Sequence, residues 1–313
     1  MITVTKAPPY LAIQDAGRTG FRADGVPRGG AMDLFAIRAG NLMVGNDSTS
    51  AALEWALAGG TITFESSTTF ALVGAGVRAT IGGRAIPPCT TTRAAAGEQL
   101  VVEQFLTGRF LYLALSGGID VPAVLGSRST YLPGHFGGLD GRLVKRGDQL
   151  ALGTPTFLPR EGFHCAAELL PRYENETVHI TRGPQADLFG DDAFRILGES
   201  SHRISSASDR TGYKLDGPSI GSGPGSLPSE AACPGSMQIP GDGHPIILMA
   251  DAPTVGGYPK IAVVSEADLP IVAQRRPGEI LRFELVTTEQ TQKALRRRAS
   301  DLSAIAQLAA RAV

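Results

Sequence analysis

Four clusters of polar side chains set among glycines are the parts of this sequence whose residue types could do chemistry. They occupy residues 14–18 with 29–33, 126–131 with 137–142, 208–212, and 250–260. Glycine lets a backbone approach a ligand closely and direct its N–H groups at an anion. Arginine grips a carboxylate or phosphate through two parallel hydrogen bonds, and a nearby carboxylate moves a proton or orients the arginine. One such cluster alone is a common turn with an Asp–Arg ion pair, but four predict a shared site for an anionic or amide-like ligand.

Several other kinds of site are not predicted. The sequence has no Gly-x-x-x-x-Gly-Lys-Ser/Thr loop and no Gly-x-Gly-x-x-Gly between a strand and a helix, which argues against a Walker-type phosphate cradle and a Rossmann site. The three cysteines, Cys89, Cys165 and Cys233, are far apart and include no Cys-x-x-Cys pair, so we expect reduced thiols. The five histidines lack metal-ligand spacing, and no metal site is predicted.

Composition excludes further classes of protein. Of 313 residues, 42% are hydrophobic and 19% are charged, which is typical of a soluble globular protein. The net charge is −1, from 29 basic and 30 acidic side chains, whereas a nucleic-acid binder needs excess cation. No apolar run approaches the roughly 20 residues that span a bilayer, and residues 1–6 do not resemble a secretory signal. We expect a cytoplasmic protein that binds neither nucleic acid nor membranes.

The 39 glycines and 21 prolines predict many turns and therefore many short strands. Nine apolar or alternating segments lie between turn signals, and their β-branched content favours strands. The nine segments are Ile2–Val4, Thr61–Phe64, Phe70–Val73, Gln99–Phe105, Arg109–Leu115, Val178–Thr181, Pro245–Met249, Lys260–Val264 and Ile280–Leu285. Their spacing is near ten residues in places, which is typical of β-sandwiches and barrels. The fold class predicted is mainly β.

Few helices are expected. Asp33 can cap a helix over Asp33–Val44, in which apolar residues recur at helical spacing, and a short second turn is expected at Thr49–Ala56. The clearest helix is C-terminal, from about Glu289 to Ala312. Its expected apolar stripe consists of Leu295, Leu302, Ile305 and Ala309. The arginines at 296–298 are interpreted as a solvated helix face.

A break near residues 158–175, which contains Pro159 and Pro171, separates two strand-rich halves. We therefore expect an N-terminal β-rich domain over residues 1–160, a C-terminal β-barrel over 176–288 and a C-terminal helix over 289–313. The Gly-Pro-rich stretch Gly221–Pro228 is interpreted as a mobile loop over a site. An internal similarity between Arg18–Gly25 and Arg210–Gly217 is interpreted as a trace of duplication, with two similar barrels related by pseudo-twofold symmetry.

The polar clusters resemble motifs of the biotin-dependent carboxyltransferase family, which includes allophanate hydrolase subunit 2, the KipA proteins and the C-type subunits of 5-oxoprolinases. In the first half, the matching segments are Ile13–Arg18, Gly25–Asp33, Asn41–Asn46, Gly117–Pro122 and Leu125–Tyr131. In the second half, they are Arg182–Gln185, Ser208–Arg210, Gly235–Pro240 and Gly256–Pro259. The family pattern Gln-Thr-Thr-Gly-Gly-Tyr-Pro reads Pro-Thr-Val-Gly-Gly-Tyr-Pro here, with two substitutions.

The resemblance implies two cyclophilin-like β-barrels and one half of a bipartite site. The partner implied is a subunit resembling KipI or allophanate hydrolase subunit 1. One family activity is the ATP-dependent opening of 5-oxoproline to glutamate, by a complex that also contains a lactam-utilisation subunit, the A-type subunit of 5-oxoprolinase. This activity is the function expected here, with ATP shared with the partner subunit.

Two alternatives stay open. The chain could transfer a carboxyl group to urea as part of a urea amidolyase, in which case carboxybiotin is the carboxyl donor. It could also be a regulator of the KipA kind, which binds a KipI-like kinase inhibitor.

Under the enzymatic interpretations, the catalytic residues expected are Arg18, Arg128 and Arg210 as anion clamps, with Asp15 and Asp209 as proton-transfer or orienting groups. The substrate-binding residues expected are Gln14, Gly30, Met32, Thr130, Gln238, Thr254, Gly256, Gly257 and Tyr258.

Overall fold

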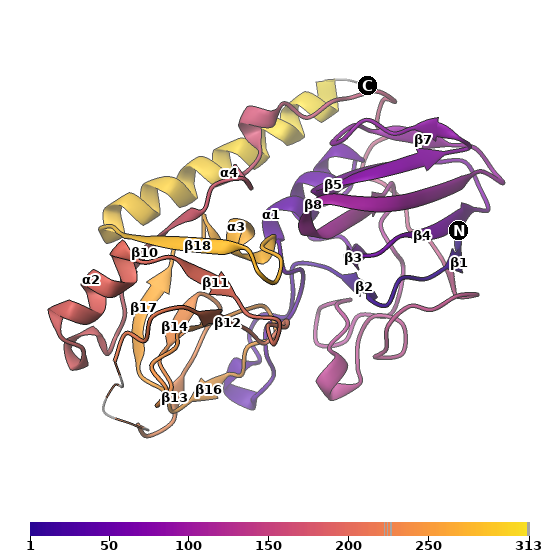
Figure 1. The fold of residues 1–313 in the computed structure, drawn as a ribbon. Helices are drawn as coiled ribbons and strands as arrows, with labels where there is room; N and C mark the ends of the chain where they lie inside the picture. The colour runs from indigo at the N-terminus through magenta and orange to yellow at the C-terminus, as the bar shows by residue number, and fades with distance from the viewer. Residues whose placement is uncertain (222, 224, 226, 312–313) are drawn as a thin grey trace. The chain divides into compact units, whose positions relative to one another are not determined.

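A nine-stranded sheet, a closed barrel and a two-stranded sheet organise the residues that the computed structural model describes, namely 1–221, 223, 225 and 227–311 (Figure 1). The chain forms two compact units. The first contains residues 1–18, 29–170 and 299–313, and the second contains 19–28 and 171–298. In this division residues 19–28 belong to the second unit, and the C-terminal helix is divided at residue 299. The domain boundaries expected from the sequence stay a prediction.

The sheet of the first unit has nine strands. They are β1 Ile2–Lys6, β2 Leu11–Gln14, β3 Ala52–Ala56, β4 Gly60–Phe64, β5 Thr68–Ile81, β6 Arg84–Ala85, β7 Thr92–Ala94, β8 Gln99–Leu115 and β9 Gln149–Leu150. The strand order is β2-β3-β8-β4-β1-β9, and β5 pairs with β6, β7 and β8. The long strands β5 and β8 pair with register shifts near Gly74 and Gly76, where the sheet curls.

The core of this sheet is built from strand residues that alternate inward. Ile2 and Val4 on β1, and Leu53 and Trp55 on β3, are fully buried in it. Helix α1, Leu34–Met43, packs against β5 and β8. Asp33 caps it as predicted, since its carboxylate accepts a hydrogen bond from the Ala36 N–H at 2.9 Å.

The second unit contains a closed barrel, β10-β17-β14-β15-β12-β11-β18. Its strands are β10 Thr177–Arg182, β11 His202–Ile204, β12 Gly212–Asp216, β14 Ser236–Gln238, β15 Ile246–Leu248, β17 Lys260–Val264 and β18 Ile280–Leu285. Strand β18 closes the ring by pairing in parallel with β10 and antiparallel with β11. A two-stranded ribbon, β13 Glu230–Ala231 with β16 Val255–Gly256, lies outside the ring order.

The remaining helices are α2 Asp191–Glu199, α3 Leu269–Ala273 and α4 Thr288–Arg311. Helix α2 packs against β18 through Ala193 and Leu197. The buried face of α4 consists of Asp301, Ile305 and Ala309, whereas Leu295 is 42% exposed, so the predicted stripe was wrong at that residue. The C-terminal helix is confirmed to Arg311, and residue 312, included in the prediction, lies outside the described residues. None of the described helices has the length and hydropathy to cross a membrane.

The mainly β fold class is confirmed, and all nine predicted strand segments form strands. Gln99–Phe105 and Arg109–Leu115 are parts of one strand, β8, which continues through Gly108 at φ 71°. The short turn expected at Thr49–Ala56 was wrong. Residues 52–56 form β3, because β2 and β8 pair with it on both sides.

The internal similarity does not mark equivalent structures. Residues 22–24 form a 3-10 helix in an irregular segment, whereas Gly212–Asp216 is a barrel strand. The same residue types therefore serve different backbone conformations in these two segments, and the duplication stays a prediction. Within the loop expected at Gly221–Pro228, residues 222, 224 and 226 lie outside the described residues.

Candidate functional site

Asp15, directly after β2, is the centre of the first polar constellation, which we call the Asp15 hub. Its carboxylate accepts hydrogen bonds from Ser127 Oγ at 2.7 Å, Gly17 N–H at 2.8 Å and Arg128 N–H at 2.5 Å. The Ser129 hydroxyl also donates to it, and that hydroxyl accepts from the Asp15 N–H at 3.1 Å. Asp15 is 7% exposed. The contacts fix residues 127–129 beside the end of β2, which is an orienting function for this carboxylate.

Arg18 and Arg128 belong to the same constellation but differ in exposure. Arg18 is 2% exposed, donates to the carbonyl oxygens of Val124 and Ser129, and has its guanidinium 4.7 Å from the centroid of the Phe136 ring. Arg128 donates from Nε to the Val121 carbonyl at 2.7 Å, and its side chain is 43% exposed. Its contact with Asp120 is 3.4 Å long and exposed. Of the two guanidinium groups, that of Arg128 is the more accessible to an anion.

The turn at residues 29–33 packs against the hub. A Cβ on Gly30, at φ 85°, would lie 2.7 Å from Gly17 N, so only glycine allows this approach of the two backbones. The Ala31 N–H donates to the Asp15 carbonyl at 2.9 Å. Gln14 donates to the Thr130 carbonyl at 3.2 Å, and its Oε1 has no hydrogen-bond partner among the described residues. The predicted residues Gln14, Asp15, Arg18, Gly30, Met32, Arg128 and Thr130 thus come together in one region.

The turn at residues 29–33 is also held by a buried carboxylate, that of Glu54, which was not predicted as a site residue. Glu54 on β3 is fully buried and accepts hydrogen bonds from the hydroxyls of Tyr10, at 2.9 Å, and Tyr112, at 2.7 Å, and from the Met32 N–H, at 2.8 Å. The Tyr112 hydroxyl in turn accepts from the Asp33 N–H at 2.8 Å. Burial, followed by the charges of Glu54 and Asp33, raises the pKa of Tyr112 well above its usual 10.0, so this hydroxyl stays a donor.

The predicted pair Asp209 and Arg210 lies in the second unit, where the two residues have separate functions. Arg210 is 9% exposed and forms a two-pronged ion pair with Asp251, Nε–Oδ2 2.7 Å and Nη2–Oδ1 2.9 Å. Asp209 is exposed and accepts from the N–H groups of Thr211 and Gly212, which forms an Asx turn. The clamp function of Arg210 stays a prediction, and the structure adds that Asp251 already engages its guanidinium.

Three of the resembling segments meet at one end of the barrel, and we call this constellation the Lys260 cluster. Lys260, the first residue of β17, has a side chain only 4% exposed, and its Nζ lies 2.8 Å from Glu230 Oε1 on β13. Gln185 connects both residues: its Nε2 donates to Glu230 Oε1 at 2.5 Å, and its Oε1 accepts from the Lys260 N–H at 3.0 Å. A Cβ on Gly183 would lie 2.3 Å from the Lys260 carbonyl oxygen, which explains the glycine before Gln185.

Gln238 and the loop at residues 254–258 complete the Lys260 cluster. Gln238 is 5% exposed, and its Nε2 has no hydrogen-bond partner among the described residues. A Cβ on Gly256 would lie only 2.8 Å from that nitrogen, so the amide is packed against the backbone of the loop at residue 256. Thr254 is buried, whereas Tyr258 is 46% exposed and Gly257 is half-buried. The predicted residues Gln238, Gly256, Gly257 and Tyr258 are therefore close neighbours.

Sequence reasoning missed Glu54 and Glu230, and it included Gln185, Asp251 and Lys260 in motifs without assigning them a function. One signal was available for two of them: Glu54 and Lys260 are single charges at the inner positions of apolar strands, and a buried charge requires a partner. Their partners could not be found by spacing. Lys260 pairs with a residue 30 positions away, and Glu54 with a residue 58 positions away.

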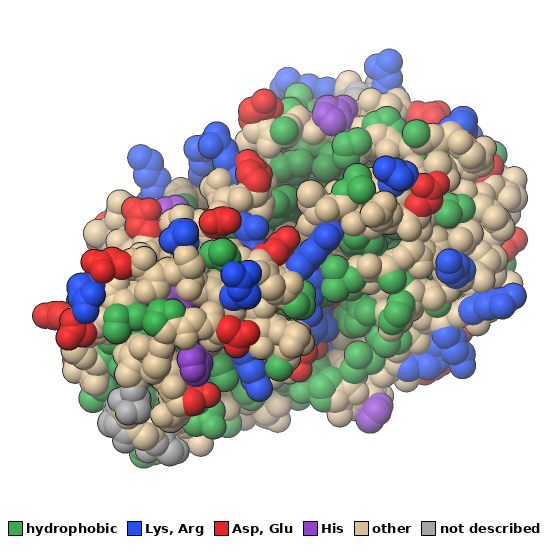
Figure 2. Space-filling model, viewed as in Figure 1, with side chains coloured by type: hydrophobic (Ala, Val, Ile, Leu, Met, Phe, Trp, Pro, Cys, Tyr) green, Lys and Arg blue, Asp and Glu red, His purple; other side chains and the backbone are tan. Residues whose placement is uncertain are grey.

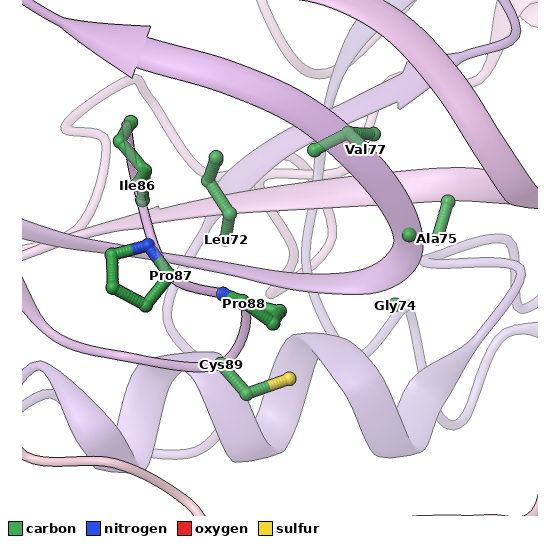
Figure 3. A pocket seen from close by; sticks show the side chains of 9 residues that line it. Leu72, Gly74, Ala75, Val77, Ile86, Pro87, Pro88 and Cys89 are labelled. Atoms are coloured by element: carbon green, nitrogen blue, oxygen red, sulfur yellow. The ribbon is translucent and has the colours of Figure 1, made fainter. Parts of the chain in front are cut away.

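A small apolar hollow in the first unit lies where β5 bends (Figure 3). It is lined by Leu72, Gly74, Ala75, Gly76, Val77, Ile86, Pro87, Pro88 and Cys89. Burial raises the pKa of the Cys89 thiol to about 11, so the sulfur is protonated at neutral pH and a poor nucleophile. With no charged side chain in its lining, this hollow offers no acid–base chemistry.

On the face drawn in Figure 2, basic and acidic side chains are interspersed.

Comparisons with known proteins agree with the resemblance. This chain is 38% identical to the C-type subunit of 5-oxoprolinase from Escherichia coli K12, over 94% of each chain. It is also 34% identical to urea amidolyase of Lachancea kluyveri, over 90% of this chain but 16% of that protein. Among solved structures, the Kluyveromyces lactis urea amidolyase superposes with a TM-score of 0.89 at 30% identity, over 97% of this chain and 20% of that chain.

A family model described as the carboxyltransferase domain, subdomain A and B, matches residues 24–285. The match includes the strands of the closed barrel, the Lys260 cluster and the residues 127–129 that contact Asp15. The chain therefore belongs to this carboxyltransferase-domain family.

Proposed function

We propose that this chain is the C-type subunit of a 5-oxoprolinase, a multi-subunit hydrolase that opens 5-oxoproline to glutamate. The observation that carries the proposal is the end-to-end match to the Escherichia coli C-type subunit, over 94% of both chains. The second such relative, from Haemophilus influenzae, is 34% identical over 95% of both chains. The urea amidolyases, in contrast, match this chain over only about a sixth of their own length.

Ring opening of a lactam breaks an amide bond and adds the elements of water, and the amide carbonyl is a poor electrophile. In this proposal ATP is consumed to activate the carbonyl, and the nucleotide is shared with a partner subunit because this sequence has no Walker-type loop. The partners proposed are a KipI-like subunit and a lactam-utilisation subunit of the A type.

The residues of this chain would bind and orient the substrate. Arg128 is the arginine of the Asp15 hub whose guanidinium reaches solvent, and its backbone N–H is fixed by Asp15 at 2.5 Å. A preorganised cation of this kind stabilises negative charge that develops on a carbonyl oxygen.

The test is reconstitution of the chain with its two proposed partners, with glutamate release from 5-oxoproline and ATP as the readout. We expect turnover only when all three subunits are present. Arg128→Ala should lower kcat by about a hundredfold, as when an oxyanion donor is removed, whereas Arg84→Ala, which removes an exposed pair with Glu98, should leave it unchanged. Absence of glutamate from the complete, folded mixture would overturn the proposal.

A second candidate is carboxyl transfer from carboxybiotin to urea or a similar amide. The TM-score of 0.89 to the urea amidolyase structure favours it as the alternative. This function requires a biotinylated carrier protein as partner. Co-purification of a biotinylated carrier with this chain, detected with labelled streptavidin, would support it over the lactam reaction. A second supporting result would be carboxylation of urea by this chain mixed with that carrier, a biotin carboxylase, ATP and bicarbonate, without streptavidin.

A further inference from the structure

We propose that Lys260 is the binding group for a substrate carboxylate, that Glu230 occupies this position in the absence of ligand, and that the Gln238 amide donates to the carbonyl of the same ligand. The chemical class recognised is a small acid that carries an amide carbonyl near its carboxylate. The inference deepens the proposed function, since 5-oxoproline belongs to this class, and it rests on that function only for the identity of the substrate.

Lys260 is a buried cation whose charge is balanced by one carboxylate among the described residues. Its side chain is 96% buried, and among the described residues Glu230 is its carboxylate partner, at 2.8 Å. A buried ammonium is strongly disfavoured without an anion, so some carboxylate has to occupy this position. The interior therefore contains a position that selects for negative charge.

Glu230, unlike Lys260, lies where its carboxylate can reach water. Its side chain is 44% exposed, and it lies on the two-residue strand β13, which pairs only with β16 among the described strands. A carboxylate on such a short ribbon can move to water and regain its full solvation, whereas Lys260 in the barrel strand cannot move out. A ligand carboxylate can therefore exchange for Glu230 with no net change of buried charge.

The Gln238 amide lies beside Lys260 and is unpaired at its nitrogen among the described residues. Gln238 is paired with Lys260 across β14 and β17, beside a register shift between Met237 and Gln238, and both side chains are buried. Gln238 is 95% buried, and its Nε2 has no partner among the described residues. A buried donor without an acceptor costs free energy that a bound carbonyl oxygen would recover.

The loop above the cluster leaves space for this donor. Gly256 has no Cβ, and a Cβ there would lie 2.8 Å from Gln238 Nε2. Gly256 also belongs to β16, the partner strand of Glu230. The same ribbon thus carries both the exchangeable carboxylate and the glycine next to the amide, so movement of the ribbon would expose both recognition groups together.

The experiment measures binding of three probes by calorimetry, both to the full chain and to the chain mixed with its partner subunits. The probes are 5-oxoproline, 2-pyrrolidinone, which lacks the carboxylate, and propionate, which lacks the lactam. Glu230→Gln removes the competing carboxylate and should tighten 5-oxoproline binding by about fivefold or more, while leaving 2-pyrrolidinone unchanged. Glu199→Gln, which removes an exposed carboxylate paired with Arg195, is the matched control and should change nothing.

Two further variants test the recognition groups. Lys260→Met keeps the length of the side chain and should weaken 5-oxoproline and propionate about tenfold or more, without affecting 2-pyrrolidinone. Gln238→Leu should weaken both lactams and spare propionate. Because Glu230→Gln is expected to improve binding, a loss of folding cannot imitate the full pattern, and thermal melting checks each variant.

The outcomes separate this inference from the proposed function. Glutamate production that is insensitive to Glu230→Gln and Lys260→Met would overturn the carboxylate site and leave the 5-oxoprolinase assignment intact. Carboxylate binding that depends on Lys260, without any glutamate production, would support the site and overturn the proposed reaction. No saturable binding of 5-oxoproline or propionate to either preparation would overturn the inference.

Discussion

The Asp15 hub and the Lys260 cluster are both buried charges within glycine-rich motifs, but their partners differ. Asp15 accepts hydrogen bonds from two backbone N–H groups and two serine hydroxyls of its own unit. Lys260 has one half-exposed carboxylate as its counterion, next to an amide without a partner among the described residues. A charge whose partners all belong to the fold stabilises the fold, whereas a charge with a replaceable partner can bind a ligand.

The same distinction separates the predicted arginines. Arg210 is bound by the buried carboxylate of Asp251, and Arg18 by backbone carbonyls, whereas Arg128 is 43% exposed at its side chain. Substitution of each should therefore affect different properties.

Arg210→Ala should lower the free energy of unfolding by about 3–5 kcal/mol, because it leaves the Asp251 carboxylate buried and unpaired. Arg128→Ala should lower it by less than about 1 kcal/mol, since its ion pair is exposed. Urea denaturation of both variants measures the difference. Equal free energies of unfolding for the two variants would contradict the interpretation of Arg210 as a structural arginine and of Arg128 as an accessible one.

Asp15→Ala should lower the free energy of unfolding by about 2–3 kcal/mol, because the hydroxyls and N–H groups around the carboxylate lose a charged acceptor. Asp209→Ala is the matched control, since its carboxylate is exposed and supports only an Asx turn. Its expected cost is below about 1 kcal/mol. The measurement is again urea denaturation, and a smaller loss for Asp15 than for Asp209 would contradict the hub as a structural centre.

Tyr112→Phe should lower the free energy of unfolding by about 1 kcal/mol, since Glu54 keeps its hydrogen bonds from Tyr10 and Met32 while the Asp33 N–H loses the Tyr112 hydroxyl as its acceptor. Hydrogen exchange at the Asp33 amide should become faster in this variant. Unchanged exchange would show that the hydroxyl does not hold the turn at residues 29–33.

Stability should also decrease in mild acid through His202, which is fully buried. Burial, with a smaller contribution from His244, lowers its pKa below the usual 6.5, so the unfolded chain binds the proton more readily than the folded chain. The stabilisation is complete above pH 6.5 and is lost as the pH falls through the lowered pKa. Thermal melting of the wild type and His202→Phe between pH 7 and 5 should show a weaker pH dependence in the variant.

The strands were predictable from the sequence because apolar residues and turn signals are local. Lys260–Val264 and Ile280–Leu285, for example, are found at their predicted bounds. The parallel pairing of β10 with β18 was not predictable, since it joins segments about a hundred residues apart. The functions of the arginines were not predictable either. Arg18, for example, donates to backbone carbonyl oxygens, and since every residue has one, no sequence pattern identifies the partner. The glycine-rich motifs located the polar constellations, but only coordinates separated satisfied groups from unsatisfied ones.

The closure of the barrel by β18 determines when the second unit can fold. Strand β10 begins at Thr177, and its parallel partner ends at Leu285, so the ring has two open edges until the later strand is available. Closing so long a segment costs entropy that local contacts do not recover, which slows folding. During synthesis on the ribosome, the earlier six strands would therefore form at most an open sheet, with β10 and β11 as unpaired edges, until Leu285 has left the exit tunnel.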